Sequence, residues 1–274
     1  MQTVDRYALV DGSYQHSLLR DAPRLDAYAK AIAAQVREGD VVADLGSGSG
    51  VLAALAVRAG AARVHAVEAH RLAAGHLRQL LALNGLAEQV AVHEGDAERW
   101  EPPEPVDVVV CELMETGLLH EPVAAAMRNV HRWPARPRAI VPAGARLLVE
   151  GVAVRDTFHG YRAPLPSFRA SESGVPITNA ACYLALDFLA APPPDGVDAA
   201  FALTARTDGE LTGLRLRTET LLTPWLPHET SPAYCPPVVL PLPEPLRVRA
   251  GQGLEGKLRY TFAFDERPVA FEVH

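Results

Sequence analysis

The sequence predicts an α/β protein in which a parallel sheet, covered by helices on both faces, is followed by an antiparallel β-barrel or β-sandwich. Two patterns lead to this expectation. From Asp40 onward, short β-branched runs alternate with Ala- and Leu-rich segments whose apolar residues have helical spacing. After Val141-Pro142 the helical spacing ends, and strand-like runs separated by Gly and Pro turns continue to the last residue.

The length of 274 residues suits one large domain or two small ones, with enough chain to bury a sizeable core. Apolar residues at helical spacing predict an N-terminal helical segment over residues 1–36. The alternating pattern defines a sheet domain over 37–145. The later strand-like runs define a β domain over 146–274.

Each element follows from its own run of residues. In the sheet domain we expect strands over 40–45, 63–69, 89–95, 106–113 and 138–142, and helices over 46–60, 70–86 and 122–133. In the β domain we expect strands over 145–154, 181–190, 200–207, 211–222, 237–242, 254–264 and 268–274.

Composition excludes several classes of protein. The net charge of -7 rules out a broad basic surface for nucleic acid and favours a cationic acceptor. For that reason we expect no nucleic-acid partner. No apolar run is long enough to span a membrane, so we also expect no membrane partner. Three scattered cysteines and ten histidines lack metal-ligand spacing, which favours a reduced cytoplasm and no metal. The many arginines, alanines and prolines indicate a GC-rich bacterial genome.

A glycine-rich loop joins the first predicted strand to the first helix, with the sequence Asp44-Leu45-Gly46-Ser47-Gly48-Ser49-Gly50. Glycine lets the backbone approach a ligand closely, and nucleotides bind at the carboxyl ends of parallel strands. Glu68 ends the second strand, where a carboxylate can accept hydrogen bonds from two ribose hydroxyls. Gly95-Asp96-Ala97-Glu98 follows the third strand and would reach an adenine.

The spacing of these glycines separates two cofactors. Dinucleotides are bound by G-x-G-x-x-G, whereas this loop reads G-x-G-x-G after an aspartate, which disfavours a nicotinamide-dependent reductase. The pattern fits S-adenosylmethionine, which has no pyrophosphate to hold. We therefore expect a Rossmann-like sheet that binds S-adenosylmethionine. Its predicted ligands are Asp44, Gly46, Ser47, Gly48, Gly50, Glu68, Ala69, Asp96, Ala97, Glu98 and Glu112.

Two glutamates nine residues apart follow the fourth strand, within Cys111-Glu112-Leu113-Met114-Glu115-Thr116-Gly117-Leu118-Leu119-His120-Glu121. A short loop can turn both Glu112 and Glu121 toward one pocket, where carboxylates would hold a cationic acceptor. The alternative is that Glu121 only favours a helix N-terminus while Glu112 binds backbone amides. We expect Glu115 to be an exposed loop acid.

The segment CELMETGLLHE resembles the double-glutamate loop of the protein arginine methyltransferases, S-E-W-M-G-Y-x-L-x-x-E. Further segments are similar to that family: SLLRDAPR to its N-terminal helix, VVADLGSGSGVLA to its cofactor loop, PRAIVPAGARLLVE to its sheet-to-barrel junction and PEPLRVRAGQGLEGKLRY to a barrel hairpin. Similarity covers roughly residues 14–155 and 210–260. The chain thus resembles a divergent bacterial member of this family of class I methyltransferases.

The resemblance implies roles for individual residues. Glu112 and Glu121 would be catalytic, Arg24 would bind the cofactor carboxylate, and Leu18 would stand near the reacting methyl. We expect an acceptor pocket formed by Tyr14, Leu18, Met114, His120 and Tyr234.

The chain also departs from the family pattern. Ala233-Tyr234-Cys235 stands where the family has Thr-His-Trp, so Tyr234 rather than a histidine would face Asp21. Residues 156–178 occupy the place of the family's dimerisation arm and are rich in proline and serine. We expect them to form a surface loop; the alternative is that Tyr161, Arg162, Phe168 and Arg169 border an acceptor pocket. A homodimer is therefore left open.

These observations predict an S-adenosylmethionine-dependent N-methyltransferase. Its acceptor would be a guanidine or amine, in a peptide or in a small natural product. Two alternatives stay open: an O- or C-methyltransferase of bacterial secondary metabolism, and a regulatory protein that binds the cofactor without catalysis.

Overall fold

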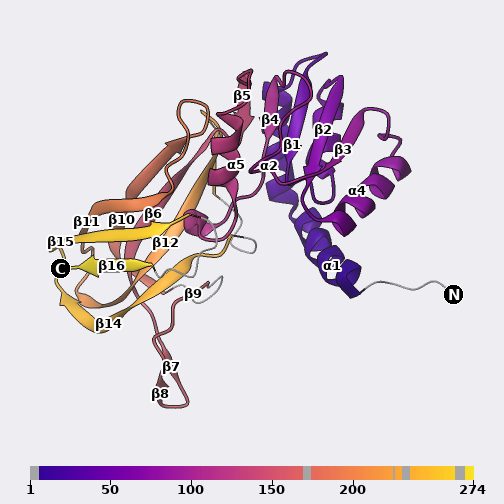
Figure 1. Ribbon diagram of the computed structural model, residues 1–274. Helices are drawn as coiled ribbons and strands as arrows, with labels where there is room; N and C mark the ends of the chain where they lie inside the picture. The colour runs from indigo at the N-terminus through magenta and orange to yellow at the C-terminus, as the bar shows by residue number, and fades with distance from the viewer. Residues whose placement is uncertain (1–5, 169–173, 225, 230–234, 263–268) are drawn as a thin grey trace.

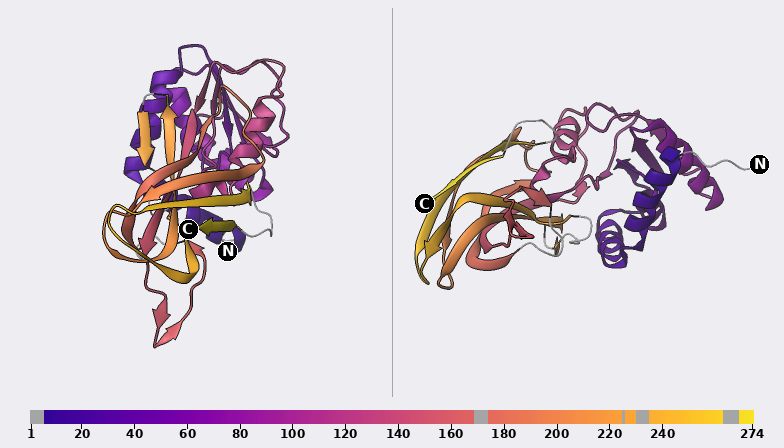
Figure 2. Two further views of the ribbon diagram at one scale, coloured as in Figure 1. Left: turned by 90° about the vertical axis from the view of Figure 1, so that its left-hand side faces the viewer. Right: turned by 90° about the horizontal axis from the view of Figure 1, so that it is seen from below.

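The computed structural model has two halves that lie side by side, a helix-covered parallel sheet and a curved β half (Figures 1 and 2). The expected fold class is confirmed. The structure describes residues 6–168, 174–224, 226–229, 235–262 and 269–274.

Two helices precede the sheet: α1 (Arg6–Arg20) and α2 (Ala22–Gln35). Asp21 is the N-cap of α2, and its Oδ1 accepts a hydrogen bond from the Arg24 N–H at 3.2 Å. Helix α2 buries Tyr28 and Ile32 against the sheet, together with the side chain of Arg24. This buried arginine places a positive charge beside the sheet.

The parallel sheet has the strand order β3-β2-β1-β4-β5, with every neighbouring pair parallel. Its strands are β1 (Val41–Leu45), β2 (Arg63–Glu68), β3 (Val90–Glu94), β4 (Val108–Val110) and β5 (Ala139–Val141). The helices between them are α3 (Val51–Arg58), α4 (Arg71–Leu83) and α5 (Val123–Val130).

Successive side chains of a strand point to opposite faces, so this sheet has a core on each side. Val108 and Val110 pack with Ile32 of α2, whereas Val109 packs with Met127 of α5. Because both faces are covered, the strands β4 and β5 consist entirely of apolar residues. The carboxyl ends of the strands remain available for a ligand.

The β half contains a six-stranded and a three-stranded antiparallel sheet, which an isolated bridge between Thr178 and Ala205 links. The larger sheet has β6 (Gly144–Ala153), β9 (Ser167–Phe168), β10 (Val175–Asp187), β12 (Gly209–Thr223), β13 (Leu226–Glu229) and β14 (Val238–Val248). The smaller one has β11 (Gly196–Thr204), β15 (Gly253–Thr261) and β16 (Ala270–Val273).

The segment expected as a surface loop contains short strands. A hairpin of β7 (Thr157–Phe158) and β8 (Tyr161–Arg162) projects from the β half (Figures 1 and 2). A positive φ at Gly160 makes the tight reversal between these strands, which residue composition alone does not reveal. No helix among the described residues is long and apolar enough to cross a membrane.

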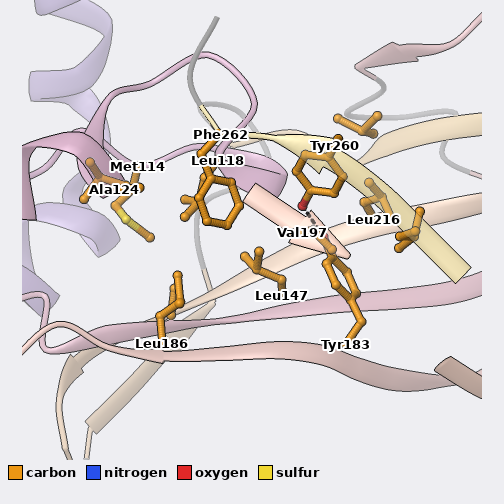
Figure 3. Packing of buried hydrophobic residues seen from close by; sticks show 14 of the residues in the cluster. Met114, Leu118, Ala124, Leu147, Tyr183, Leu186, Val197, Leu216, Tyr260 and Phe262 are labelled. Atoms are coloured by element: carbon orange, nitrogen blue, oxygen red, sulfur yellow. Dashed lines mark hydrogen bonds between the residues drawn. The ribbon is translucent and has the colours of Figure 1, made fainter. Parts of the chain in front are cut away.

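One hydrophobic core continues from the sheet into the β half. Met114 and Leu118, from the segment after β4, pack in the same cluster as Leu147 of β6 and Tyr260 of β15 (Figure 3). The residues between the two predicted glutamates are therefore part of the contact between the halves.

Candidate active site

A pocket of about 200 Å³ lies at the carboxyl ends of β1, β2 and β4, beneath the two N-terminal helices. It collects residues that are far apart in the sequence. The predicted site residues that line it are Tyr14, Leu18, Arg24, Gly46, Ser47, Gly48, Glu68, Ala69, Glu112 and Glu121.

The glycine loop forms one wall of this pocket. Gly46, Gly48 and Gly50 all have positive φ, and Gly50 is the N-cap of α3. A Cβ on Gly50 would lie 2.4 Å from Leu77 Cδ1, and one on Gly48 would lie 2.7 Å from Gln15 Oε1. The backbone angles therefore favour glycine here, and a Cβ at Gly48 or Gly50 would in addition require the end of a neighbouring side chain to move.

Glu68 closes the same wall from the end of β2. Its Oε2 accepts a hydrogen bond from the Gly48 N–H at 3.0 Å, and its Oε1 accepts one from the His70 N–H at 2.9 Å. These two bonds orient the carboxylate at the pocket. A carboxylate oxygen has two lone pairs, so each oxygen can still accept from a ribose hydroxyl.

Arg24 and Glu112 form a buried ion pair on the opposite wall. Arg24 Nη1 lies 3.0 Å from Glu112 Oε2, with side-chain exposures of 6% and 21%. Arg24 Nη2 also donates to the Leu18 carbonyl, whereas its Nε has no hydrogen-bond partner among the described residues. A buried donor that lines a pocket is suited to bind a ligand carboxylate.

Glu112 and Glu121 reach this pocket from the two ends of one segment, the acid loop, which comprises residues 111–121. Burial raises the pKa of Glu112 to about 7, against the opposing effect of Arg24, and the nearby charge of Glu121 raises it further. Burial and then the charge of Glu115 raise the pKa of Glu121. A cationic acceptor between the two carboxylates would relieve both effects.

Glu115 has a role inside the acid loop that its sequence position did not reveal. Its carboxylate accepts hydrogen bonds from the backbone N–H groups of His120 and Glu121, the latter at 2.9 Å. It also pairs with His120 Nδ1 at 3.2 Å, and its side chain is only 14% exposed. The expectation of an exposed acid was wrong, because the loop folds back over this side chain.

Partial burial, followed by the charges of Glu121 and Glu112, raises the pKa of Tyr14 to about 12. This phenol therefore stays protonated and can act as a hydrogen-bond donor beside the two acids. Asp44 lies behind the glycine loop, where burial raises its pKa to about 7. Its Oδ2 has no hydrogen-bond partner in the described part of the chain.

Some predicted residues do not line this pocket. Met114 is buried in the core, and His120 lines a neighbouring cavity with Phe168. Asp44 near the end of β1, Gly50 after it, and Asp96, Ala97 and Glu98 after β3 lie at the same edge of the sheet but are not among the lining residues. Tyr234, and with it the expected contact to Asp21, lies outside the described residues.

Sequence reasoning missed several lining residues: Gln15, Ser49, Val51, Leu52, Leu113 and Pro122. Gln15 matters most, because its Oε1 accepts a hydrogen bond from the Ser49 N–H at 3.1 Å and so joins α1 to the glycine loop. The only available signal was its position beside Tyr14. Ser49, Val51, Leu113 and Pro122 directly neighbour predicted residues in the sequence, and Leu52 is two positions from Gly50.

The residues present fit S-adenosylmethionine. An unpartnered buried guanidinium nitrogen of Arg24 suits the carboxylate of the methionine part. The oriented carboxylate of Glu68 suits ribose hydroxyls, and the glycine loop, without any Cβ, allows a ligand to approach its backbone closely.

Comparison with known proteins identifies the family. The family model described as ribosomal protein L11 methyltransferase (PrmA) matches residues 27–130. The uncharacterized protein MJ1452 of Methanocaldococcus jannaschii is 30% identical over 231 residues, which cover 84% of this chain and 85% of that protein. Protein arginine N-methyltransferase PRMT10 of Arabidopsis thaliana is 38% identical over 137 residues, 49% of this chain. The chain belongs to the arginine-methyltransferase-like class I methyltransferases.

Its methyl donor is therefore S-adenosylmethionine. The same fold occurs in the solved Trypanosoma brucei PRMT1 enzyme-prozyme complex with AdoHcy, with a TM-score of 0.77 at 23% identity. That match covers 90% of this methyltransferase and 87% of the solved chain. The chain spans only 36% of the length of the Arabidopsis relative.

Proposed function

We propose that this methyltransferase transfers a methyl group to a guanidine nitrogen, in an arginine residue of a peptide or in a small arginine-like molecule. The observation that carries the proposal is that Glu112 and Glu121 line one pocket with the predicted cofactor ligands. The similarity to arginine methyltransferases supports the same acceptor class.

Two carboxylates are what a guanidine acceptor requires. A guanidinium is protonated and delocalised at neutral pH, so its nitrogens are poor nucleophiles. Charge-assisted hydrogen bonds to Glu112 and Glu121 would draw the positive charge toward the acids and orient one nitrogen toward the donor. When bound, S-adenosylmethionine supplies the methyl group; the new N–C bond forms as the S–C bond breaks.

Methyl transfer also requires a group that accepts one proton from the product. The methylated guanidinium releases one N–H proton, so that the product again carries a single positive charge. We assign this proton to Glu112 or Glu121, because both line the pocket and the raised pKa of each suits a carboxylate that holds a proton briefly. Tyr14 stays protonated beside them and can hydrogen-bond the acceptor.

The decisive experiment replaces Glu112 by Gln. Turnover of an arginine-containing peptide with labelled donor should fall about 100-fold or more, because charge stabilisation and orientation are both lost. Binding of S-adenosylhomocysteine, followed by calorimetry, should weaken far less than turnover, because Glu112 is only one of several predicted cofactor ligands. Glu101→Gln, at an exposed glutamate away from the pocket, is the matched control and should keep wild-type turnover.

The pH dependence tests the same carboxylate. Since the pKa of Glu112 is about 7, kcat/KM should rise with pH through that region and then level off, as the carboxylate form accumulates. Unchanged turnover in Glu112→Gln, or methylation only of hydroxyl or carbon acceptors in a panel, would contradict the proposal.

Three further expectations stay predictions: the boundaries at residues 36 and 145, the cytoplasmic location and the homodimer. The β7–β8 hairpin supports a homodimer, because it projects from the β half with Phe158 and Tyr161 exposed.

A further inference from the structure

The middle of the acid loop is a tight turn with an unusual backbone. The short 3-10 helix Thr116–Leu118 includes Gly117 at φ +73°, and the next residue, Leu118, has φ +55°. A leucine in the left-handed region is disfavoured, because its Cβ approaches the following carbonyl. Such a conformation persists only where surrounding contacts hold it.

The β half supplies these contacts through both backbone groups of Gly117. The Gly117 N–H donates to Thr218 Oγ1 of β12 at 2.9 Å. The Tyr260 hydroxyl, from β15, donates to the Gly117 carbonyl at 3.0 Å. Both side chains are at least 94% buried, so water does not compete for these bonds. Two distant strands therefore bind one residue of the acid loop.

A second tyrosine is hydrogen-bonded to Tyr260. Tyr183 of β10 and Tyr260 point toward one another, with their hydroxyl oxygens 2.8 Å apart (Figure 3). A phenol has a single proton, and Tyr260 gives its proton to Gly117, so Tyr183 must donate to Tyr260. Burial also raises the pKa of Tyr260 well above its ordinary value, which keeps this hydroxyl a donor.

Thr116 adds a third attachment one residue earlier. Its Oγ1 donates to the Cys235 carbonyl at 3.3 Å, across the boundary between the halves. Leu118, one residue later, is fully buried in the shared core. The turn is thus held at three successive residues, with Glu112 and Glu121 at its two ends.

We propose that Tyr260 and Thr218 are positioning residues for methyl transfer, because they hold Gly117 in the turn that brings Glu112 and Glu121 to one pocket. This inference rests on the proposed function of the two acids. Neither residue lines the pocket, so each acts through the acid loop. A misplacement of about 1 Å at a reacting group can cost about 100-fold in rate, so a loosened turn should lower turnover.

The test compares Tyr260→Phe with Tyr183→Phe in the full chain. Each variant loses one buried hydroxyl of the same pair, but only Tyr260→Phe loses the bond to Gly117. We expect kcat with an arginine-containing peptide to fall about 10- to 100-fold in Tyr260→Phe and much less in Tyr183→Phe. The affinity for S-adenosylhomocysteine should stay within about twofold in both variants, because neither tyrosine lines the cofactor pocket.

Amide hydrogen exchange gives a readout that does not depend on activity. A peptide spanning residues 112–121 should exchange faster in Tyr260→Phe than in Tyr183→Phe. At the second contact, Thr218→Val should reproduce the loss of turnover, whereas Thr218→Ser, which keeps the hydroxyl, should restore most of it.

Equal losses of kcat in the two tyrosine variants, or wild-type exchange of the loop in Tyr260→Phe, would overturn this inference. These outcomes are separable from a failure of the proposed function. If Glu112→Gln keeps full turnover, the role of the acids is wrong, while the exchange measurement still shows whether Tyr260 holds the loop.

Discussion

The two walls of the pocket are built over very different lengths of chain. The glycine loop is held by Glu68 and Gln15, at sequence separations of 20 and 34 residues. The acid loop is held by Thr218 and Tyr260, at separations of 101 and 143 residues. Closing a longer chain segment costs more conformational entropy. The acid loop is therefore ordered only once the strands that carry Thr218 and Tyr260 have packed against it.

We therefore expect cofactor binding to depend mainly on the glycine loop, and acceptor binding to depend mainly on the acid loop. The hydrogen bonds that Glu68 and Gln15 make to the glycine loop come from the parallel sheet and the first helix, so they do not require the β half. The acid loop reaches its conformation only when the two halves pack together, because Thr218 and Tyr260 of the β half bind it. Changes at their junction should therefore affect turnover more than cofactor affinity.

The largest expected effect comes from Arg24→Met, which removes the ion pair that joins α2 to the acid loop. Glu112 would remain in a largely buried site without its partner, and breaking a buried pair typically lowers the free energy of unfolding by about 3 kcal/mol or more. Urea denaturation at pH 8 measures this loss.

The double variant Arg24→Met with Glu112→Gln provides the control. It no longer contains the unpaired carboxylate, so it should recover part of the stability at pH 8. If the single and double variants are equally unstable, the loss comes from packing of the arginine side chain and not from its charge.

A smaller effect is expected from Asp44→Asn in the glycine wall. The carboxyl of Asp44 titrates near 7 in the folded protein but near 3.8 in its unperturbed state, so the folded state binds its proton more tightly. Ionisation of Asp44 therefore destabilises the fold as the pH rises from about 4 to 7.

Asn keeps the neutral form at every pH, so the variant should be more stable than the wild type at pH 8, and the difference should shrink as the pH falls. Below pH 4 the difference should vanish. Urea denaturation of both proteins at several pH values checks this; a difference that does not depend on pH would contradict the raised pKa.

The smallest effect is expected from Glu115→Ala, which removes the acceptor for the N–H groups of His120 and Glu121. Unfolding should become easier by about 1 kcal/mol, and kcat/KM should fall several-fold as Glu121 loses its orientation. Glu115→Gln keeps an acceptor oxygen and should lie between the alanine variant and the wild type. Steady-state kinetics and thermal denaturation distinguish the three proteins.

Much of the cofactor wall could be predicted from the sequence. Gly46, Gly48 and Glu68 follow directly from strands whose apolar pattern is strong, and a parallel sheet brings the carboxyl ends of such strands to one edge. Asp96 and Glu98 were harder to place, because a turn after a strand can point toward a ligand or away from it. Both residues lie at the predicted edge of the sheet, after β3, but neither lines the pocket.

The acceptor side was less predictable. The spacing of Glu112 and Glu121 indicated a shared pocket, but Met114 and His120 lie between them and turn to other surroundings. A loop without a regular period gives no rule for the direction of its side chains. The buried position of Glu115 could not be read from the sequence for the same reason.

Local periodicity and the chemistry of single residues are enough to predict the order of strands and helices, the glycine loop and the two acids. The pairing of Arg24 with Glu112, and the contacts of Tyr260 and Thr218 with the acid loop, become visible only in the folded protein. Such contacts join residues separated by up to 143 positions, and they form only when the two halves bury a common core.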